Sequence, residues 1–258
     1  MKDALGDRMK EFYENRSKTY LTRRTPVIIR LDGKAFHSFT RGFNRPYDEI
    51  FHQTMNETLK LLCMNIQGCK IGYTQSDEIT LLLTDYEKLN TDAWFGYSVQ
   101  KMCSVAASMA TLFFNQQLRK SFEEYFNENT TSEEYYLTMV RAVDKGAMFD
   151  ARAFNIPKEE VANCFIWRQQ DATRNAIQML GQSFFSHKEL ENKDQNDIQD
   201  MLMLDKGVNF NDMPIEFKRG VCCYKKDCGS SEGRPHWFVD LHIPIFTQDR
   251  EYIEKWIG

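Results

Sequence analysis

Residues 28–37 read Ile28-Ile29-Arg30-Leu31-Asp32-Gly33-Lys34-Ala35-Phe36-His37, and residues 72–79 read Gly72-Tyr73-Thr74-Gln75-Ser76-Asp77-Glu78-Ile79. In the first segment an apolar, β-branched run stops at an aspartate that is followed at once by a glycine. In the second, two carboxylates occupy a polar break between the strand-like runs 69–73 and 79–83, a pattern that predicts a hairpin. Both segments therefore bring carboxylates to the end of a strand.

These carboxylates suit a divalent-metal site that handles a nucleoside triphosphate. Mg²⁺ prefers hard oxygen ligands, commonly one or two carboxylates together with substrate phosphates and water. Asp32, the carbonyl of Gly33 and Asp77 supply such a partial shell if their strands lie side by side. Glu78 follows Asp77 directly, so strand alternation points it the other way unless the turn twists it back. On spacing alone, turn aspartates that merely close strands are an equally good interpretation.

Outward from these segments, apolar periodicity predicts an α+β protein. Helices are expected over 3–18, 48–66, 92–119 and 158–185, with 122–136 joining or extending the third. Strands are expected over 25–31, 147–155, 217–225 and 236–246, with a turn at 227–233 and a loop or linker at 188–200. The order strand, helix, hairpin, helix, strand predicts an antiparallel sheet with two helices covering one face.

The composition describes an ordered protein that buries a core. Of 258 residues, 42% are hydrophobic and 13% aromatic, which excludes disorder. No apolar stretch approaches the roughly 20 residues that span a bilayer, so no membrane partner is expected. The N-terminus lacks the apolar segment of a signal peptide, which makes the cytoplasm the expected location.

The cysteines and the charges bear on whether the protein binds zinc and whether it binds RNA. Seven cysteines at irregular spacing argue against a disulfide framework. Adjacent Cys222 and Cys223 on a strand would point to opposite faces, which favours reduced thiols over a zinc site with Cys228 and nearby histidines. The net charge of −4 opposes nucleic-acid binding, but local basic pairs such as Lys218-Arg219 permit an RNA partner.

Several motifs together resemble the tRNA(His) guanylyltransferase superfamily, the 3′–5′ nucleotide-adding polymerases. They are Arg-Leu-Asp-Gly-x-x-Phe-His at 30–37 and Gln-Ser-Asp-Glu at 75–78, followed in order by segments at 94–95, 149–152, 167–171 and 209–214. The resemblance implies a catalytic domain like the palm of ordinary polymerases. We expect one compact unit over 1–258, with a palm-like core at 24–156 and a C-terminal extension at 157–258.

The resemblance also implies roles for individual residues. Asp32, Asp77 and Glu78 are the expected catalytic residues, and Asp32, Gly33 and Asp77 are expected to bind two Mg²⁺ ions. The expected nucleotide-binding residues are Asp32, Gly33, Lys34, Ala35, Phe36, His37, Arg45, Asp48, Ser76, Asp77 and Lys101. Arg45 departs from the lysine that is common in the family. Lys101 is equally well interpreted as an exposed helix lysine.

The implied reaction uses ATP to adenylylate the 5′ end of a tRNA, after which the 3′-hydroxyl of GTP or another nucleoside triphosphate displaces AMP. Family members that recognise tRNA(His) carry the string His-Ile-Asn-Asn-Leu-Tyr-Asn, whereas residues 173–179 here read Thr-Arg-Asn-Ala-Ile-Gln-Met. We therefore expect template-dependent repair of truncated tRNA 5′ ends, as in the Thg-like proteins of bacteria and archaea, and a homotetramer. The alternatives are addition of a single G to tRNA(His), a non-catalytic RNA-binding protein and a nucleotide cyclase.

Overall fold

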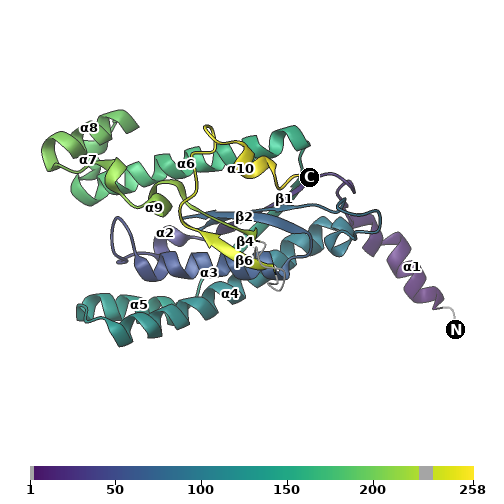
Figure 1. Ribbon diagram of the computed structural model, residues 1–258. Helices are drawn as coiled ribbons and strands as arrows, with labels where there is room; N and C mark the ends of the chain where they lie inside the picture. Colours follow the sequence, from purple (N-terminus) through teal and green to yellow (C-terminus); the bar gives the residue numbers. More distant parts are fainter. Residues whose placement is uncertain (1–2, 227–234) are drawn as a thin grey trace.

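The computed structural model describes residues 3–226 and 235–258, and a six-stranded antiparallel sheet lies at its centre (Figure 1). In spatial order the strands are β4 (Phe149–Asn155), β1 (Val27–Gly33), β3 (Glu78–Leu83), β2 (Cys69–Gln75), β5 (Val221–Lys226) and β6 (His236–Asp240). Every neighbouring pair is antiparallel. The antiparallel α+β fold expected from the sequence is confirmed.

Helices cover both faces of this sheet, as the alternation of side chains along β1 requires. Ile29 and Leu31 point into the core that contains α3 (Glu49–Asn65) and α4 (Val99–Glu128). Ile28 points the other way, into a core with α6 (Lys158–Phe184) and α10 (Glu251–Glu254). Figure 1 shows α3 and α4 on one side of the sheet and α6 on the other.

Helix α6 extends beyond the sheet and carries a third, smaller core. Its second half packs with α7 (His187–Leu190), α8 (Gln195–Lys206) and α9 (Ile215–Arg219). The loop predicted over 188–200 is therefore wrong. Asp194 caps α8, and buried Ile198 and Leu202 fix it to α6, although the other side chains of this segment are mostly polar.

Several helices also differ from the predicted elements. Helix α1 (Ala4–Phe12) stops early, a 3₁₀ turn (Glu14–Ser17) follows it, and α1 buries no residue as it extends from the body in Figure 1. A 3₁₀ turn (Trp94–Tyr97) precedes α4, and a separate helix α5 (Glu133–Lys145) follows it. Short helix α2 (Phe36–Phe39) and a 3₁₀ turn (Phe210–Asp212) were not predicted.

The two C-terminal strands are shorter than predicted. Helix α9 takes up the start of the predicted strand 217–225, and Gly220, with φ of 81°, ends that helix just before β5. Cys222 and Cys223 of β5 lie in the cores on opposite faces, as expected. The turn predicted at 227–233, including Cys228, lies outside the described residues. Among the helices that the structure describes, none is long and apolar enough to cross a membrane.

Candidate active site

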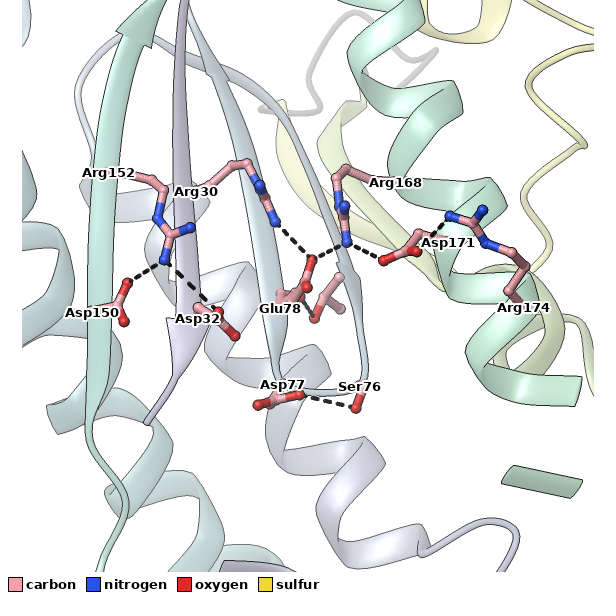
Figure 2. A network of polar contacts seen from close by, with 11 residues as sticks. Arg30, Asp32, Ser76, Asp77, Glu78, Asp150, Arg152, Arg168, Asp171 and Arg174 are labelled. Carbon is pink, nitrogen blue, oxygen red and sulfur yellow. Dashed lines mark hydrogen bonds and ion pairs between the residues drawn. The ribbon is translucent and has the colours of Figure 1, made fainter. Parts of the chain in front are cut away.

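Asp32 and Asp77 come together at the end of the sheet where β1 ends and the turn between β2 and β3 lies (Figure 2). Asp32 lies near the end of β1, where it pairs with Glu78 of β3. Asp77 occupies the tight turn between β2 and β3, and its carbonyl accepts a hydrogen bond from the Gly33 N–H at 3.2 Å. Ser76, with φ of 54°, makes the turn tight enough for this contact. The two strands expected to lie side by side are therefore hydrogen-bonded neighbours.

The environment of Asp77 disfavours an uncompensated negative charge. The pKa of its carboxyl is raised to about 6, chiefly by burial, with smaller contributions from the charges of Asp32 and Glu78. Hydrogen bonds from its own backbone N–H and from the Ser76 hydroxyl, 3.1 Å away, oppose that rise. Two close carboxylates, one of them poorly hydrated, form a site whose charge a cation would neutralise.

The donor set fits Mg²⁺ better than a metal held by protein ligands alone. Within the described residues there is no group of three or more His, Cys, Asp or Glu side chains placed to hold a metal. Mg²⁺ does not need one, because phosphates and water complete its octahedral shell. Asp32, Asp77 and the Gly33 carbonyl are the groups that would hold it.

Glu78 lies on the same face of the sheet as Asp32, because directly paired residues of neighbouring strands share a face. Its Oε2 accepts from Nη2 of Arg30 at 3.1 Å and from Nη2 of Arg168 at 2.6 Å. Asp171 accepts from the same Arg168 nitrogen at 2.7 Å, and from Arg174 at 2.7 Å. Figure 2 shows this row of alternating charges running from the sheet to α6. The carboxylate of Glu78 thus links β3 to α6.

Arg152 of β4 lies on the other side of Asp32. Its Nη2 is 3.1 Å from an oxygen of Asp150 and 3.9 Å from an oxygen of Asp32. Its side chain is 55% exposed, so a ligand can reach it. Arg152 is the cation nearest to Asp32 in the network of Figure 2.

The segment after β1 turns sharply toward α2. The Gly33 N–H is donated to Asp77 and the Lys34 N–H to the Met148 carbonyl at 2.8 Å. Ala35 is left-handed with φ of 56°, and α2 begins directly after it. The first N–H groups of a helix have no partner within the helix, so those of Phe36 and His37 are available to a phosphate.

Gly33 is required here by packing. A Cβ at Gly33 would lie 2.2 Å from the ring of Phe36, which is itself buried against Phe39, Phe114 and Phe149. Gly33 is one of the expected nucleotide-binding residues, and a glycine lets a phosphate approach the backbone closely. The structure adds a second reason, which is that the Phe36 ring lies directly over it.

A cavity of about 380 Å³ opens beside Ser76 and Asp77. On one side it is lined by α3 and the loop before it, and on the other by α6 and α9. Aromatic side chains make up much of its wall: Phe36, Phe43, Tyr47, Phe51 and Phe217. Its volume lies within the usual range for small-molecule sites, and its apolar wall suits the flat faces of a nucleobase.

Three of the predicted nucleotide-binding side chains, His37, Arg45 and Asp48, also line this cavity. His37 and Arg45 are exposed. Asp48 is buried and already accepts hydrogen bonds from the N–H groups of Phe51 and Asn44 and from the hydroxyl of Tyr135. Its carboxylate therefore caps α3 and fixes the cavity wall.

Lys101 is the predicted residue that the structure does not bring to this site. It lies in the first turn of α4, with its ammonium 6.0 Å from the centre of the Phe95 ring. The neighbouring Ser98 pairs with Tyr20, which precedes β1. Lys101 is therefore at the end of the sheet where β1 begins, whereas Asp32 lies where β1 ends.

Sequence reasoning did not identify the arginines of the charged network or the polar side chains of α3 that line the cavity. Arg30, Arg152 and Arg168 all fall inside the motifs quoted above, so their position in those motifs was an available signal. His52 and Asn56 of α3 line the cavity, yet they follow no motif. Their helix was predicted from its apolar stripe, which gives no information on its polar side chains.

Comparison with known proteins agrees with this geometry. The family model for tRNAHis guanylyltransferase matches residues 6–157. An uncharacterized protein of Acanthamoeba polyphaga mimivirus is 30% identical over 87% of this chain and 78% of its own length. The tRNA(His) guanylyltransferase of Saccharomyces cerevisiae is 24% identical over 88% of this chain and 90% of its own.

Two solved structures resemble the whole chain. A bacterial tRNA(His) guanylyltransferase (Thg1)-like protein in complex with ATP has a TM-score of 0.84 and 43% identity, and one in complex with GTP has 0.80 and 41%. Each alignment covers 99% of both chains. The fold and the site thus define a nucleotidyltransferase. This chain belongs to the tRNAHis guanylyltransferase family.

Proposed function

We propose that this enzyme repairs truncated tRNA 5′ ends by template-dependent 3′–5′ nucleotide addition. The observation that carries the proposal is the Asp32–Asp77 pair beside a cavity large enough for a nucleoside. The bacterial relatives in complex with ATP and GTP support nucleotide binding at such a site. Repair in place of guanylylation is supported by residues 173–179, which keep one asparagine of the string typical of tRNA(His)-specific members.

The reaction consists of two displacements at phosphorus. In the first, an oxygen of the RNA 5′-monophosphate attacks the α-phosphorus of ATP, and the bond to the departing pyrophosphate breaks. In the second, the 3′-hydroxyl oxygen of a nucleoside triphosphate attacks the activated 5′-phosphorus of the RNA. AMP leaves, and the hydroxyl proton passes to solvent. Each step spreads negative charge over phosphate oxygens, so electrostatic stabilisation is the main catalytic need.

The residues of the site meet that need in different ways. Asp32, Asp77 and the Gly33 carbonyl would hold two Mg²⁺ ions, which would supply positive charge next to the reacting phosphates. The N–H groups of Phe36 and His37 would donate to the triphosphate. The hydroxyl of Ser76, which donates to Asp77, would reach a phosphate only by turning away from that carboxylate. Arg45, exposed in the lining of the cavity, would contact a phosphate of a second nucleotide. Lys101 could join only a phosphate that reaches the far end of the sheet.

The second candidate is addition of one non-templated G to tRNA(His). The curated relatives that carry that name favour it. The two candidates differ in what selects the nucleotide, which is the opposite base in repair and the enzyme in guanylylation.

The decisive experiment supplies Mg²⁺, ATP and a tRNA that lacks its first nucleotide, with nucleotide 72 varied through all four bases. We expect incorporation of the complementary base in each case, with mispaired additions slower because the site tests pair geometry. Full-length tRNA(His) serves as the comparison substrate. Constant addition of G, or activity confined to tRNA(His), would establish the second candidate instead.

We also propose that residues 1–258 act as one unit, since β5 of the C-terminal extension pairs with β2 of the core. The homotetramer implied by the family resemblance stays a prediction. Light scattering of the purified protein measures its mass directly.

A further inference from the structure

Two polar side chains, His52 and Asn56, line the cavity among its aromatic residues, and neither has a role in the proposed reaction. His52 and Asn56 are four residues apart on α3, so they lie on the same face of that helix. Asn56 is 9% exposed, which is unusual burial for an asparagine.

One polar atom of each side chain lacks a hydrogen-bond partner. Within the part of the chain that the structure describes, Nε2 of His52 and Oδ1 of Asn56 are shielded from solvent and unpaired. Leaving such atoms unpaired costs stability, and a ligand that pairs with them is one way in which a protein offsets that cost. Rotation of the Asn56 carboxamide turns either its oxygen or its amide nitrogen toward the cavity. The pair is thus suited to a ligand that completes these hydrogen bonds.

His52 and Asn56 are both uncharged, so they suit an uncharged ligand that has a hydrogen-bond donor and an acceptor side by side. Burial lowers the pKa of His52 to about 4, so its imidazole is uncharged at neutral pH and offers one donor and one acceptor. An asparagine carboxamide likewise offers both, and its two polar atoms match the amino group and adjacent ring nitrogen of adenine. The Tyr47 ring, 4.8 Å from the His52 ring, adds an aromatic surface for stacking.

From these contacts we propose that Asn56 and His52 recognise the amino-bearing edge of adenine and select ATP for the activation step. This inference rests on the proposed function, which supplies the requirement for ATP. Asp48 suits this role less well, because three protein donors already occupy most of its acceptor positions and an ionised carboxylate has no donor for the ring nitrogen of adenine. Glu216, which also lines the cavity, is the residue whose carboxylate would suit the two adjacent donors of guanine.

The test measures equilibrium binding by calorimetry with Mg²⁺ and without tRNA, so that no transfer occurs. ATP is compared with purine riboside triphosphate, which lacks only the 6-amino group. We expect the wild-type protein to bind ATP about tenfold more tightly, the effect of losing one well-formed hydrogen-bonded contact. Asn56→Leu should bind the two nucleotides equally. Asn65→Leu, at the exposed end of the same helix, should keep the wild-type preference.

His52→Phe keeps the ring and removes its nitrogens, so it provides an independent second test. We expect it to reduce the preference for ATP, and it carries the test if circular dichroism shows that Asn56→Leu does not fold. Equal binding of the two nucleotides by the wild-type protein would overturn the inference and leave the proposed function standing. Tighter binding of GTP that Glu216→Gln abolishes would also overturn it. Absence of binding for every triphosphate would instead refute the proposed function.

Discussion

Asp32 and Asp77 lie close together, although different local structures position them. Asp32 ends a buried apolar strand, and Asp77 lies in a turn that Ser76 tightens through a left-handed conformation. Their proximity could be predicted because an Asp-Gly strand end and an acidic hairpin turn are both visible in the sequence. The same-face position of Glu78 could not, since it depends on the register between β1 and β3.

We predict that Asp32→Asn and Asp77→Asn each reduce both adenylylation and nucleotide addition by at least about a thousandfold. The reason is that both displacements need the same charge neutralisation. Each step can be measured separately, the second with an RNA that already carries a 5′-triphosphate. Circular dichroism and thermal unfolding provide the folding control. A folded variant with near-normal rates would contradict the two-metal assignment and favour the interpretation of these aspartates as turn residues.

His52 makes stability depend on pH. Its folded pKa of about 4 lies below the ordinary value of 6.5, because burial disfavours the charged imidazole. The unfolded chain therefore binds a proton more readily between these values, and stability that is fully present above pH 6.5 is lost as the pH falls toward 4. We predict that the free energy of unfolding falls by about 2 kcal/mol between pH 8 and pH 5 through this residue.

Urea denaturation of the wild type and of His52→Phe at several pH values isolates that contribution. Other groups titrate equally in both proteins, so the difference between the two curves reports His52. A difference that stays constant from pH 8 to pH 5 would show that His52 is not buried neutral in solution.

At the scale of elements, the position of α6 decides the shape of the site. This helix supplies one wall of the cavity, and Arg168, only 7% exposed in its side chain, connects it to β3 through Glu78. The first half of α6 also packs on the sheet through Val161 and Phe165. The ion pair therefore fixes α6 to the sheet just before the part of the helix that lines the cavity.

We predict that Glu78→Gln acts on this link and leaves the metal site intact. Mn²⁺ binding, followed by electron paramagnetic resonance, should match the wild type, whereas Asp77→Asn should lose it. The KM for the nucleotide should rise about tenfold with a smaller change in kcat. The free energy of unfolding should fall by roughly 2 kcal/mol, because the nearly buried Arg168 would lose one of the two negative charges that compensate it. Arg174→Gln, at the exposed end of the same row, should change little. Loss of Mn²⁺ binding in Glu78→Gln would make Glu78 a metal ligand.

Elements with a clear apolar period were predictable, and those fixed by distant packing were not. The apolar stripe of α3 identified that helix to within a residue at each end. Helix α8 was missed because Ile198 and Leu202 provide only a narrow apolar face, which the rest of the third core completes. Short α2 depends on Phe36 packing over Gly33, a contact that the sequence pattern does not reveal.

On the scale of the whole molecule, the sequence predicted four strands of the sheet as a unit and did not place the last two. Pairing of β5 with β2 joins residues that are far apart along the chain, such as Gly72 and Cys223. Local periodicity contains no information on such pairings. The cavity likewise depends on contacts between segments that are far apart in the sequence, since one wall comes from α3 and the other from α6 and α9.

The position of β5 has a consequence for synthesis. While a ribosome is making this chain, β2 is complete long before its outer neighbour, because α4, α5, β4 and α6 are all translated in between. Until β5 arrives, the backbone groups along β2 form an open edge that can pair with another nascent chain. A product cut off after residue 157, where the family match ends, would keep that edge permanently. Such a fragment would be prone to aggregate, and the cell would need either chaperones or rapid completion of the C-terminal strands to avoid it.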